Sequence, residues 1–280
     1  MTARILTIAG SDSGGGAGIQ ADIKTITMLG GHAMTAITAI TAQNTLGVTG
    51  VHAIPADMVI AQIDAVASDI GIDAIKIGMI GAAETAHRVA ERIAGIGAPI
   101  IFDPVMIATS GSALADDETI AVFARLMDMA TLTTPNLPEL AALGGEAEAL
   151  RQAGTLLIKG GHAEGDVLVD RLVDRSGEVA RWESPRIATT STHGTGCTLA
   201  SAIATGLGQG MTLTDAIARA RQFVRAALIA APSLGQGHGP MGHQHVEPLP
   251  FRGGVWGGEV GTRAQAGSPH PNPSPEGEGL

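Results

Sequence analysis

Short apolar runs rich in Ile and Val alternate along the chain with longer segments in which apolar residues recur at helical spacing. The short runs predict strands at residues 4–9, 32–40, 74–77, 99–102, 130–133 and 155–159. The longer segments predict helices at residues 19–29, 56–70, 84–94, 116–127, 138–143, 198–207 and 213–231. Strands that alternate with helices are typical of βαβ units. The pattern therefore predicts an α/β fold with a mostly parallel sheet covered on both faces.

Two segments depart from this alternation. Residues 167–173 and 179–182, joined by the polar turn 174–178, predict a hairpin near the end of the sheet. From residue 249 onward Pro, Gly, Glu and Ser dominate without apolar periodicity, and such a composition does not form a packed core. We therefore expect one folded domain at residues 1–248 and a disordered tail at residues 249–280.

Ligands of a parallel sheet bind at the carboxyl ends of its strands, so the residues after each predicted strand matter most. The first strand leads into the glycine-rich segment 10–18, whose spacing fits neither a Walker loop nor a dinucleotide fingerprint. We expect this segment to wrap a small polar ligand, with Asp12 and Asp22 as polar contacts. The alternative is that Asp12 or Ser13 is only an acidic or hydroxyl cap on the following helix.

Gln43 follows the second predicted strand, and Met79 follows the third. The Gln43 amide offers a donor and an acceptor together, which suits the edge of an aminopyrimidine. A surface-loop amide is an equal alternative for Gln43. Met79 could form an apolar wall of a ligand site or belong to the core.

Oxygen ligands and a cation follow the next three predicted strands. Asp103, Asn136 and Glu139 carry hard oxygen donors of the type that Mg²⁺ takes together with water and phosphate. Lys159 could pair with a phosphate as a point charge. The alternatives are a turn cap for Asp103, a place in the first turn of a helix for Glu139, and a solvated side chain for Lys159.

The segment His193-Gly-Thr-Gly-Cys197 enters the predicted helix 198–207 without a linker. Gly194 and Gly196 flank Thr195, so the main chain can approach an anion at a helix N-terminus. Cys197 is the only cysteine, and its place on the first turn predicts a lowered thiol pKa. The alternative is a tight turn with a buried cysteine.

Composition excludes several classes of function. A net charge of −10 and a pI of about 5.3 argue against a nucleic-acid partner. No apolar run has the length of a membrane span or a signal peptide, and a single cysteine suits a reducing cytoplasm. We therefore expect a cytoplasmic protein without a membrane anchor. The three histidines near residue 240 match no strong metal-ligand spacing: His238, His243 and His245.

An anion site, hard oxygen donors and a lysine at neighbouring strand ends suit phosphoryl transfer. In this order the motifs resemble the hydroxymethylpyrimidine and phosphomethylpyrimidine kinases of thiamine biosynthesis, which are ribokinase-like. The matching segments are AGSDSGGGAGIQAD at 9–22, TAQN at 41–44, IKIGMIG at 75–81, FDPVMIATSG at 102–111, TPNLPE at 134–139, KGGH at 159–162 and THGTGCTLA at 192–200.

The resemblance implies a ribokinase-like three-layer α/β/α kinase domain at residues 1–248, and a homodimer. It also implies that ATP with Mg²⁺ phosphorylates 4-amino-5-hydroxymethyl-2-methylpyrimidine and then its monophosphate. In the implied substrate pocket, Gln43 holds the pyrimidine edge beside Gly10, Ala17, Asp22, Met79 and Val105. In the implied phosphate site, Gly194, Thr195 and Gly196 form the anion hole, Cys197 takes the place of the base, Asp103 and Glu139 bind the metal, and Asn136, Lys159 and Thr195 contact the nucleotide.

Two alternatives stay open. A pyridoxal or pyridoxine kinase of the same superfamily takes a similar small heteroaromatic alcohol, although Gln43 and Met79 favour the pyrimidine. A catalytically silent vitamin-binding protein would need neither a metal site nor an anion hole, so Asp103, Glu139 and Lys159 argue against it.

Overall fold

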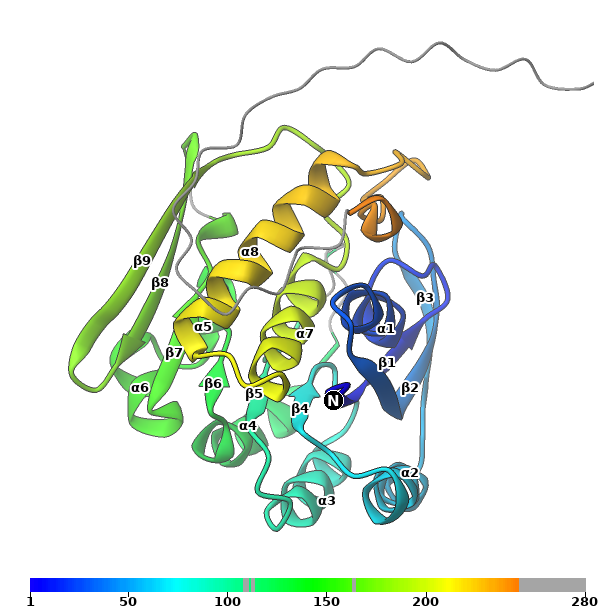
Figure 1. Ribbon diagram of the computed structural model, residues 1–280. Coiled ribbons are helices and arrows are strands. Elements are labelled where there is room, and N and C mark those ends of the chain that lie inside the picture. The colour runs from blue at the N-terminus through cyan, green and yellow to red at the C-terminus, as the bar shows by residue number, and fades with distance from the viewer. Residues whose placement is uncertain (108–110, 112–113, 163–164, 247–280) are drawn as a thin grey trace, which may run out of the picture. The chain divides into compact units, whose positions relative to one another are not determined.

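The computed structural model describes residues 1–107, 111, 114–162 and 165–246. They contain a nine-stranded sheet in the order β3-β2-β1-β4-β5-β6-β7-β8-β9 (Figure 1). Its strands are β1 Arg4–Asp12, β2 His32–Gln43, β3 Val48–Ala53, β4 Ala74–Ile77, β5 Ile100–Phe102, β6 Leu132–Thr133, β7 Thr155–Ile158, β8 Val167–Asp174 and β9 Gly177–Pro185. Six neighbouring strands of this order pair in parallel, namely β2, β1, β4, β5, β6 and β7. Strand β3 pairs antiparallel at one edge of the sheet, and β8 and β9 pair antiparallel at the other.

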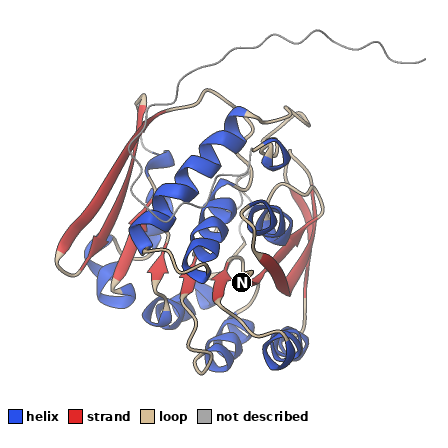
Figure 2. Cartoon of the chain, in the orientation of Figure 1, coloured by secondary structure: helices blue, strands red, loops and turns tan. Residues whose placement is uncertain are grey.

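Helices cover both faces of this sheet (Figure 2). They are α1 Gly18–Met28, α2 Ala56–Asp69, α3 Ala83–Ile93, α4 Asp117–Met129, α5 Leu137–Ala142, α6 Glu146–Ala153, α7 Thr195–Gly208 and α8 Leu213–Ile229, with 3₁₀ turns at Gly160–His162 and His243–His245. The expected three-layer α/β/α architecture is confirmed.

Two hydrophobic cores lie on opposite sides of the sheet because successive strand residues point to opposite faces. In β1, Leu6 and Ile8 belong to the core under α2, α3, α4 and α6, whereas Ile5 belongs to the core under α1, α7 and α8. In β5, Phe102 and Ile101 divide in the same way. With almost no aromatic residues, both cores consist mainly of Ala, Ile, Leu, Val and Met side chains.

The predicted strands and the hairpin are confirmed, with shifted ends. β1 and β2 continue three residues beyond their predicted ends, to Asp12 and Gln43, so these two polar residues end strands rather than start loops. Strand β3 was not predicted, because most of its residues are exposed and an edge strand with little buried face shows no clear alternation.

Helices also differ from the prediction at two places. Helix α7 begins at Thr195, three residues earlier than predicted, so the whole Thr-Gly-Cys segment forms its first turn. A further short helix, α6, lies between Leu143 and β7 and buries Ala149 and Ala153. None of the helices among the described residues is long and apolar enough to cross a membrane. The predicted tail, residues 249–280, lies outside the described residues.

Candidate active site

A cavity of about 670 Å³ opens at the carboxyl ends of the parallel strands, beside the N-terminus of α7. The structure brings nearly all of the predicted site residues to its wall: Gly10, Ala17, Gln43, Met79, Asp103, Val105, Asn136, Glu139, Lys159, Gly194, Thr195, Gly196 and Cys197. These residues come from seven separate segments, and sheet topology joins them because parallel strands end on the same edge.

Asp22 is the exception, since it lies behind the cavity and is fully buried. Both of its carboxylate oxygens lie 2.9 Å from the ammonium of Lys76, which is equally buried. Thr7 and Ser201 donate further hydrogen bonds to the same carboxylate. Asp22 is therefore not part of the cavity wall, and its observed role is to pair a buried charge. Its predicted contact with a ligand stays a prediction.

Gly194 caps the N-terminus of α7 with a left-handed φ of 84°. A side chain there would meet the Gly16 carbonyl oxygen at 1.9 Å, so the first glycine-rich loop packs directly against the α7 cap. The Thr198 N–H bonds to the Gly194 carbonyl at 2.9 Å. The Thr195 N–H bonds back to the Thr192 carbonyl at 3.4 Å, so the N–H groups of Gly196 and Cys197 are the ones that the first turn leaves for an anion.

Cys197 lies half-buried on the first turn of α7. Burial raises the pKa of its thiol to about 11, and the negative charges of Asp22 and Asp103 act in the same direction against the opposing charge of Lys76. The predicted lowering of this pKa is therefore wrong. The helix end and Lys76 favour the thiolate, but desolvation outweighs both. At neutral pH the side chain is a thiol.

A charged cluster lies beside Gly196. The Lys159 ammonium is 2.7 Å from Asp103 Oδ1 and 3.8 Å from Glu139 Oε2. The Thr134 hydroxyl also donates to Asp103, at 3.0 Å. Burial opposes the charge of Lys159, yet the two carboxylates raise its pKa above the usual value. The lysine predicted to contact phosphate is thus held by the residues predicted to bind metal.

Glu139 and Asn136 form a reciprocal cap at the start of α5. Each side chain accepts a hydrogen bond at 2.8 Å from the backbone N–H of the other residue. Burial raises the pKa of Glu139 even though Lys159 lies nearby. The alternative that Glu139 lies in the first turn of a helix is therefore correct as a structural role. A cap uses one carboxylate oxygen on a backbone N–H and leaves lone pairs for a further partner.

The donor set fits Mg²⁺ held jointly by protein and ligand. Asp103 and Glu139 both line the cavity and present carboxylate oxygens near one cation. Among the described residues no group of three His, Cys, Asp or Glu side chains could enclose a metal ion. Mg²⁺ is commonly bound through one or two carboxylates with phosphates and water completing its shell, and these residues meet that requirement.

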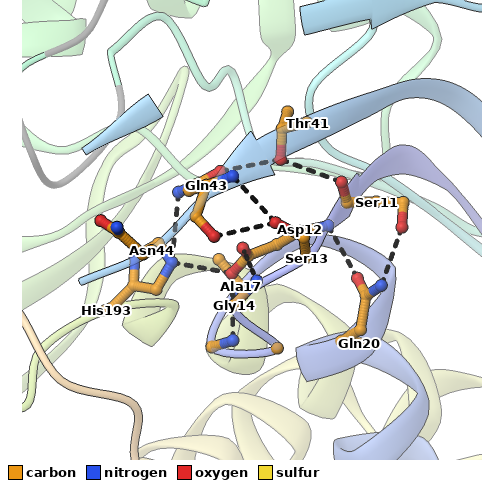
Figure 3. Close-up of polar contacts among 12 residues, drawn as sticks. Ser11, Asp12, Ser13, Gly14, Ala17, Gln20, Thr41, Gln43, Asn44 and His193 are labelled. Atoms are coloured by element: carbon orange, nitrogen blue, oxygen red, sulfur yellow. Dashed lines mark hydrogen bonds and ion pairs between the residues drawn. The ribbon is translucent and has the colours of Figure 1, made fainter. Parts of the chain in front are cut away.

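Asp12 gathers the glycine-rich loop around its carboxylate (Figure 3). Oδ1 accepts from the Gly14 N–H at 2.8 Å, while Oδ2 accepts from the N–H groups of Gly16 at 3.0 Å and Ala17 at 2.9 Å. His193 Nε2 lies 2.8 Å from the same Oδ2. Asp12 is thus a loop-organising acceptor that also reaches the cavity wall.

His193 begins the predicted anion segment, but the sequence alone assigned its side chain no role in the site. Its ring is buried and lies between Asp12 and Gln43, whose side-chain nitrogen is 3.3 Å from His193 Nε2. The Gln43 side-chain oxygen is 3.0 Å from the Thr41 hydroxyl. The position of His193 directly before the anion loop was the available signal.

Apolar walls flank the Gln43 end of the cavity. A Cβ on Gly10 would lie 2.8 Å from Met79 Cε, so the methionine fills the space that the glycine leaves open. Val105 lines the cavity after β5. The opposite end reaches β8 and α8 through apolar side chains that were not predicted as site residues: Leu168, Ile187, Val224 and Leu228.

The histidines near residue 240 have separate surroundings. His243 is buried, and its Nε2 lies 2.8 Å from the hydroxyl of Thr198 in α7. Burial lowers the pKa of His243 to about 4. His238 Nδ1 lies 3.3 Å from the Thr192 hydroxyl and borders the cavity. The segment around residue 240 therefore holds the anion loop in place.

Comparison with known proteins identifies relatives over most of the chain. A family model described as phosphomethylpyrimidine kinase matches residues 12–242. A hydroxymethylpyrimidine/phosphomethylpyrimidine kinase of Rhizobium meliloti is 46% identical over 262 residues, covering 88% of this chain and 98% of that protein. Its counterpart in Escherichia coli is 42% identical over 86% of this chain and 97% of its own. The chain spans only 52% of a longer thiamine biosynthesis bifunctional protein of Geobacter sulfurreducens, to which it is 46% identical.

Solved structures show the same fold. A Bacillus subtilis pyridoxal kinase, solved as an ADP complex, has a TM-score of 0.79 and 33% identity over 87% of this chain and 98% of its own. A phosphomethylpyrimidine kinase from Clostridium difficile has a TM-score of 0.67 and 35% identity over 80% and 98%. The expected ribokinase-like fold is confirmed. With the family model and these relatives together, the chain belongs to the phosphomethylpyrimidine kinase family.

Proposed function

We propose that this chain transfers the γ-phosphoryl group of ATP to the hydroxymethyl group of 4-amino-5-hydroxymethyl-2-methylpyrimidine and then to the resulting monophosphate. One observation carries the proposal. A single cavity holds an amide between apolar walls at one end and a helix N-terminus beside a lysine and two carboxylates at the other. This combination suits a small heteroaromatic alcohol and a phosphate chain.

The substrate lies at the Gln43 end in this proposal. The amide pairs with the aminopyrimidine edge, and Met79 and Val105 contact the ring faces. Gly10 has no side chain and Ala17 has only a methyl group, so both bring backbone close to the ring, with Met79 packed beside Gly10. The hydroxymethyl group then points toward Cys197 and the start of α7.

The triphosphate lies along the start of α7. The N–H groups of Gly196 and Cys197 take up charge that develops on the transferring phosphoryl group. Lys159 leaves its contact with Asp103 to pair with a phosphate oxygen. Asp103 and Glu139 would hold Mg²⁺, which neutralises phosphate charge and aligns the phosphoryl group.

Cys197 acts in this proposal mainly by position. A thiol with a pKa of about 11 carries its proton at neutral pH and is not a resting base. Phosphoryl transfer passes through a loose transition state, in which the attacking hydroxyl needs little deprotonation. Orientation of the hydroxyl and electrostatic stabilisation therefore supply most of the acceleration.

The adenine lies between β8 and α8, where Leu168, Val224 and Leu228 provide an apolar lining. A Staphylococcus aureus pyridoxal kinase with 31% identity and a TM-score of 0.76 was solved with AMP-PCP and pyridoxal, which supports nucleotide binding in this fold. The homodimer also belongs to the proposal, and exposed apolar side chains beside the β3 edge, Ile40, Val51 and Met58, support it. A cytoplasmic location stays a prediction.

The test measures ADP release with the pyrimidine alcohol and with pyridoxine, each with and without Mg²⁺. We expect Mg²⁺-dependent turnover that favours the pyrimidine. A preference for pyridoxine would instead assign the chain to the pyridoxal kinase alternative. Binding of the pyrimidine without turnover of either alcohol would assign a silent vitamin-binding protein.

A further inference from the structure

The proton on His193 Nε2 can be assigned from its partners. Asp12 Oδ2 already accepts two backbone N–H groups, and burial of the carboxylate is outweighed by hydrogen bonds from His193, Ala17 and Gly14, which keep the pKa of Asp12 below its usual value. An ionised carboxylate only accepts hydrogen bonds. His193 Nε2, at 2.8 Å from Oδ2, must therefore carry a hydrogen and donate it to Asp12.

This assignment determines the orientation of the Gln43 amide. A protonated Nε2 cannot accept from an amide NH₂ group, so the amide atom that faces His193 at 3.3 Å is best an oxygen. The Thr41 hydroxyl gives the same answer independently. It has one hydrogen and lies 3.0 Å from the Ser11 carbonyl, to which it donates. Its oxygen is then free to accept, so the amide atom 3.0 Å from it is best the nitrogen.

Figure 3 shows the two neighbours of the Gln43 amide, Thr41 and His193. A half-turn of the terminal amide satisfies both at once. After it, Gln43 Oε1 is the second, more distant acceptor of the single Nε2 hydrogen of His193, which Asp12 and Gln43 share in a three-centre bond. Gln43 Nε2 donates one N–H to Thr41. One N–H and one oxygen lone pair are not used by these two contacts, and Gln43 lines the cavity. The donor and the acceptor then have fixed places.

We propose that Asp12 and His193 are positioning residues that lock the Gln43 amide in this single orientation and so set the substrate specificity of the kinase. The proposal rests on the function proposed above. The locked amide pairs with a ring edge that carries an amine beside a ring nitrogen. A pyridine with a hydroxyl in place of the amine offers a different pattern and leaves the amide partly unpaired.

Packing keeps the His193 ring in place for this role. A Cβ on Gly16 would lie 2.4 Å from His193 Cδ2, so the ring rests directly on the backbone of the glycine-rich loop. The same carboxylate, that of Asp12, holds this loop and the imidazole. Loop and ring can therefore shift only together.

The first test compares the aminopyrimidine alcohol with its analogue lacking the amine, as substrates of the wild-type enzyme and of His193→Phe. The phenyl ring keeps the packing on Gly16 but cannot donate to Gln43. We expect the wild type to prefer the amine-bearing substrate in kcat/KM by roughly five- to ten-fold, the worth of one uncharged hydrogen bond. In His193→Phe this preference should fall below about two-fold. A purely structural role would lower both values of kcat/KM and leave their ratio unchanged, which would overturn the proposal.

Gln43→Met provides the matched background. Without the amide, adding His193→Phe should leave the substrate preference where Gln43→Met alone put it, because His193 acts through Gln43. A further change in preference in the double variant would show that His193 recognises the ring by another route and would contradict the proposal.

The second test needs no turnover. Nitrogen-15 NMR of histidine-labelled protein, with His193 assigned by its absence in His193→Phe, reports which ring nitrogen carries hydrogen. We expect a protonated Nε2. An unprotonated Nε2 would overturn the positioning role even in an active enzyme. If the wild type phosphorylates neither pyrimidine alcohol, the proposed function fails, while this spectrum still decides the hydrogen-bond assignment.

Discussion

The two ends of the cavity differ in how their polar side chains are paired. At the Gln43 end, Asp12, His193 and Thr41 form a hydrogen-bonded set with one charged member, which is already satisfied within the protein. At the α7 end, Lys159 is paired with Asp103 and approaches Glu139. Under the proposed function, the first end is preformed for a neutral ring. The second holds its charges in mutual pairs that a phosphate chain and its metal would rearrange.

The two ends therefore use the free energy of ligand binding differently. A preformed amide loses little entropy on binding and serves specificity. Paired charges remain stable in a buried place until the ligand arrives, and then serve transition-state stabilisation. We therefore expect substitutions at the α7 end to change the rate, and substitutions at the Gln43 end to change discrimination and KM.

The largest effect is expected from Lys159→Ala. Loss of the ammonium removes a cation from the phosphate site and leaves Asp103 without its partner. We expect kcat/KM to fall by about 10²- to 10³-fold, most of it in kcat, measured as ADP release. Arg181→Ala, which removes an exposed cation on β9 paired with Glu183, serves as control and should change kcat/KM less than two-fold. Equal losses in the two variants would contradict a specific role for Lys159.

His243 links the C-terminal segment to α7, and its titration should appear in stability. Its pKa is lowered to about 4 in the folded protein against 6.5 for an ordinary histidine. Between about pH 6.5 and pH 4 the unfolded chain therefore binds a proton at this histidine that the folded chain does not bind. The free energy of unfolding consequently falls as the pH drops through this range. The expected loss is of the order of 3 kcal/mol, measured by urea unfolding across this range.

The matched variant is His243→Gln, which can still bond to the Thr198 hydroxyl but does not titrate. Its stability should change less than that of the wild type over the same pH range, and the comparison uses this change rather than the absolute value at pH 8. An identical pH dependence in both proteins would show that other groups cause the acid sensitivity.

The thiol of Cys197 lies between the two ends and tests the burial argument. Raising the pKa from 9 to about 11 reduces the thiolate fraction at pH 7 by roughly 100-fold relative to an ordinary thiol. Alkylation by iodoacetamide should accordingly be slow at pH 7 and should rise steeply above pH 9. Cys197→Ser gives the blank. A midpoint near or below pH 8 would restore the lowered pKa expected from the helix end alone.

The smallest effect is expected from Gly10→Ala at the Gln43 end. The added methyl group meets the flexible end of Met79 at 2.8 Å, which can move aside at modest cost. We expect KM for the pyrimidine to rise by about two- to five-fold with kcat nearly unchanged, in keeping with the usual cost of slight overpacking. A loss confined to kcat would contradict the division between the two ends.

Much of this site was predictable because strand ends of a parallel sheet converge. Position at the end of an apolar strand was enough to predict that three residues line one site: Gln43, Asp103 and Lys159. The place of Glu139 in the first turn of a helix was likewise predictable from local spacing. Such local patterns extend over a few residues and do not depend on contacts between distant parts of the chain.

Long-range pairings could not be predicted in the same way. His193 and Asp12 are 181 residues apart, and Lys76 and Asp22 are 54 apart. No local pattern states that they meet. The prediction of a lowered thiol pKa for Cys197 was wrong for a related reason. The sequence shows the helix N-terminus that lowers this pKa, but it does not show the desolvation that outweighs it.

The most direct measurement is a steady-state comparison of the pyrimidine alcohol and its monophosphate as substrates with ATP and Mg²⁺. If the cavity binds a neutral ring at one end and phosphates at the other, as proposed, both compounds should turn over, and the monophosphate should gain from Lys159 and the start of α7. Absence of ADP release with both compounds, in protein shown to be folded, would contradict the account.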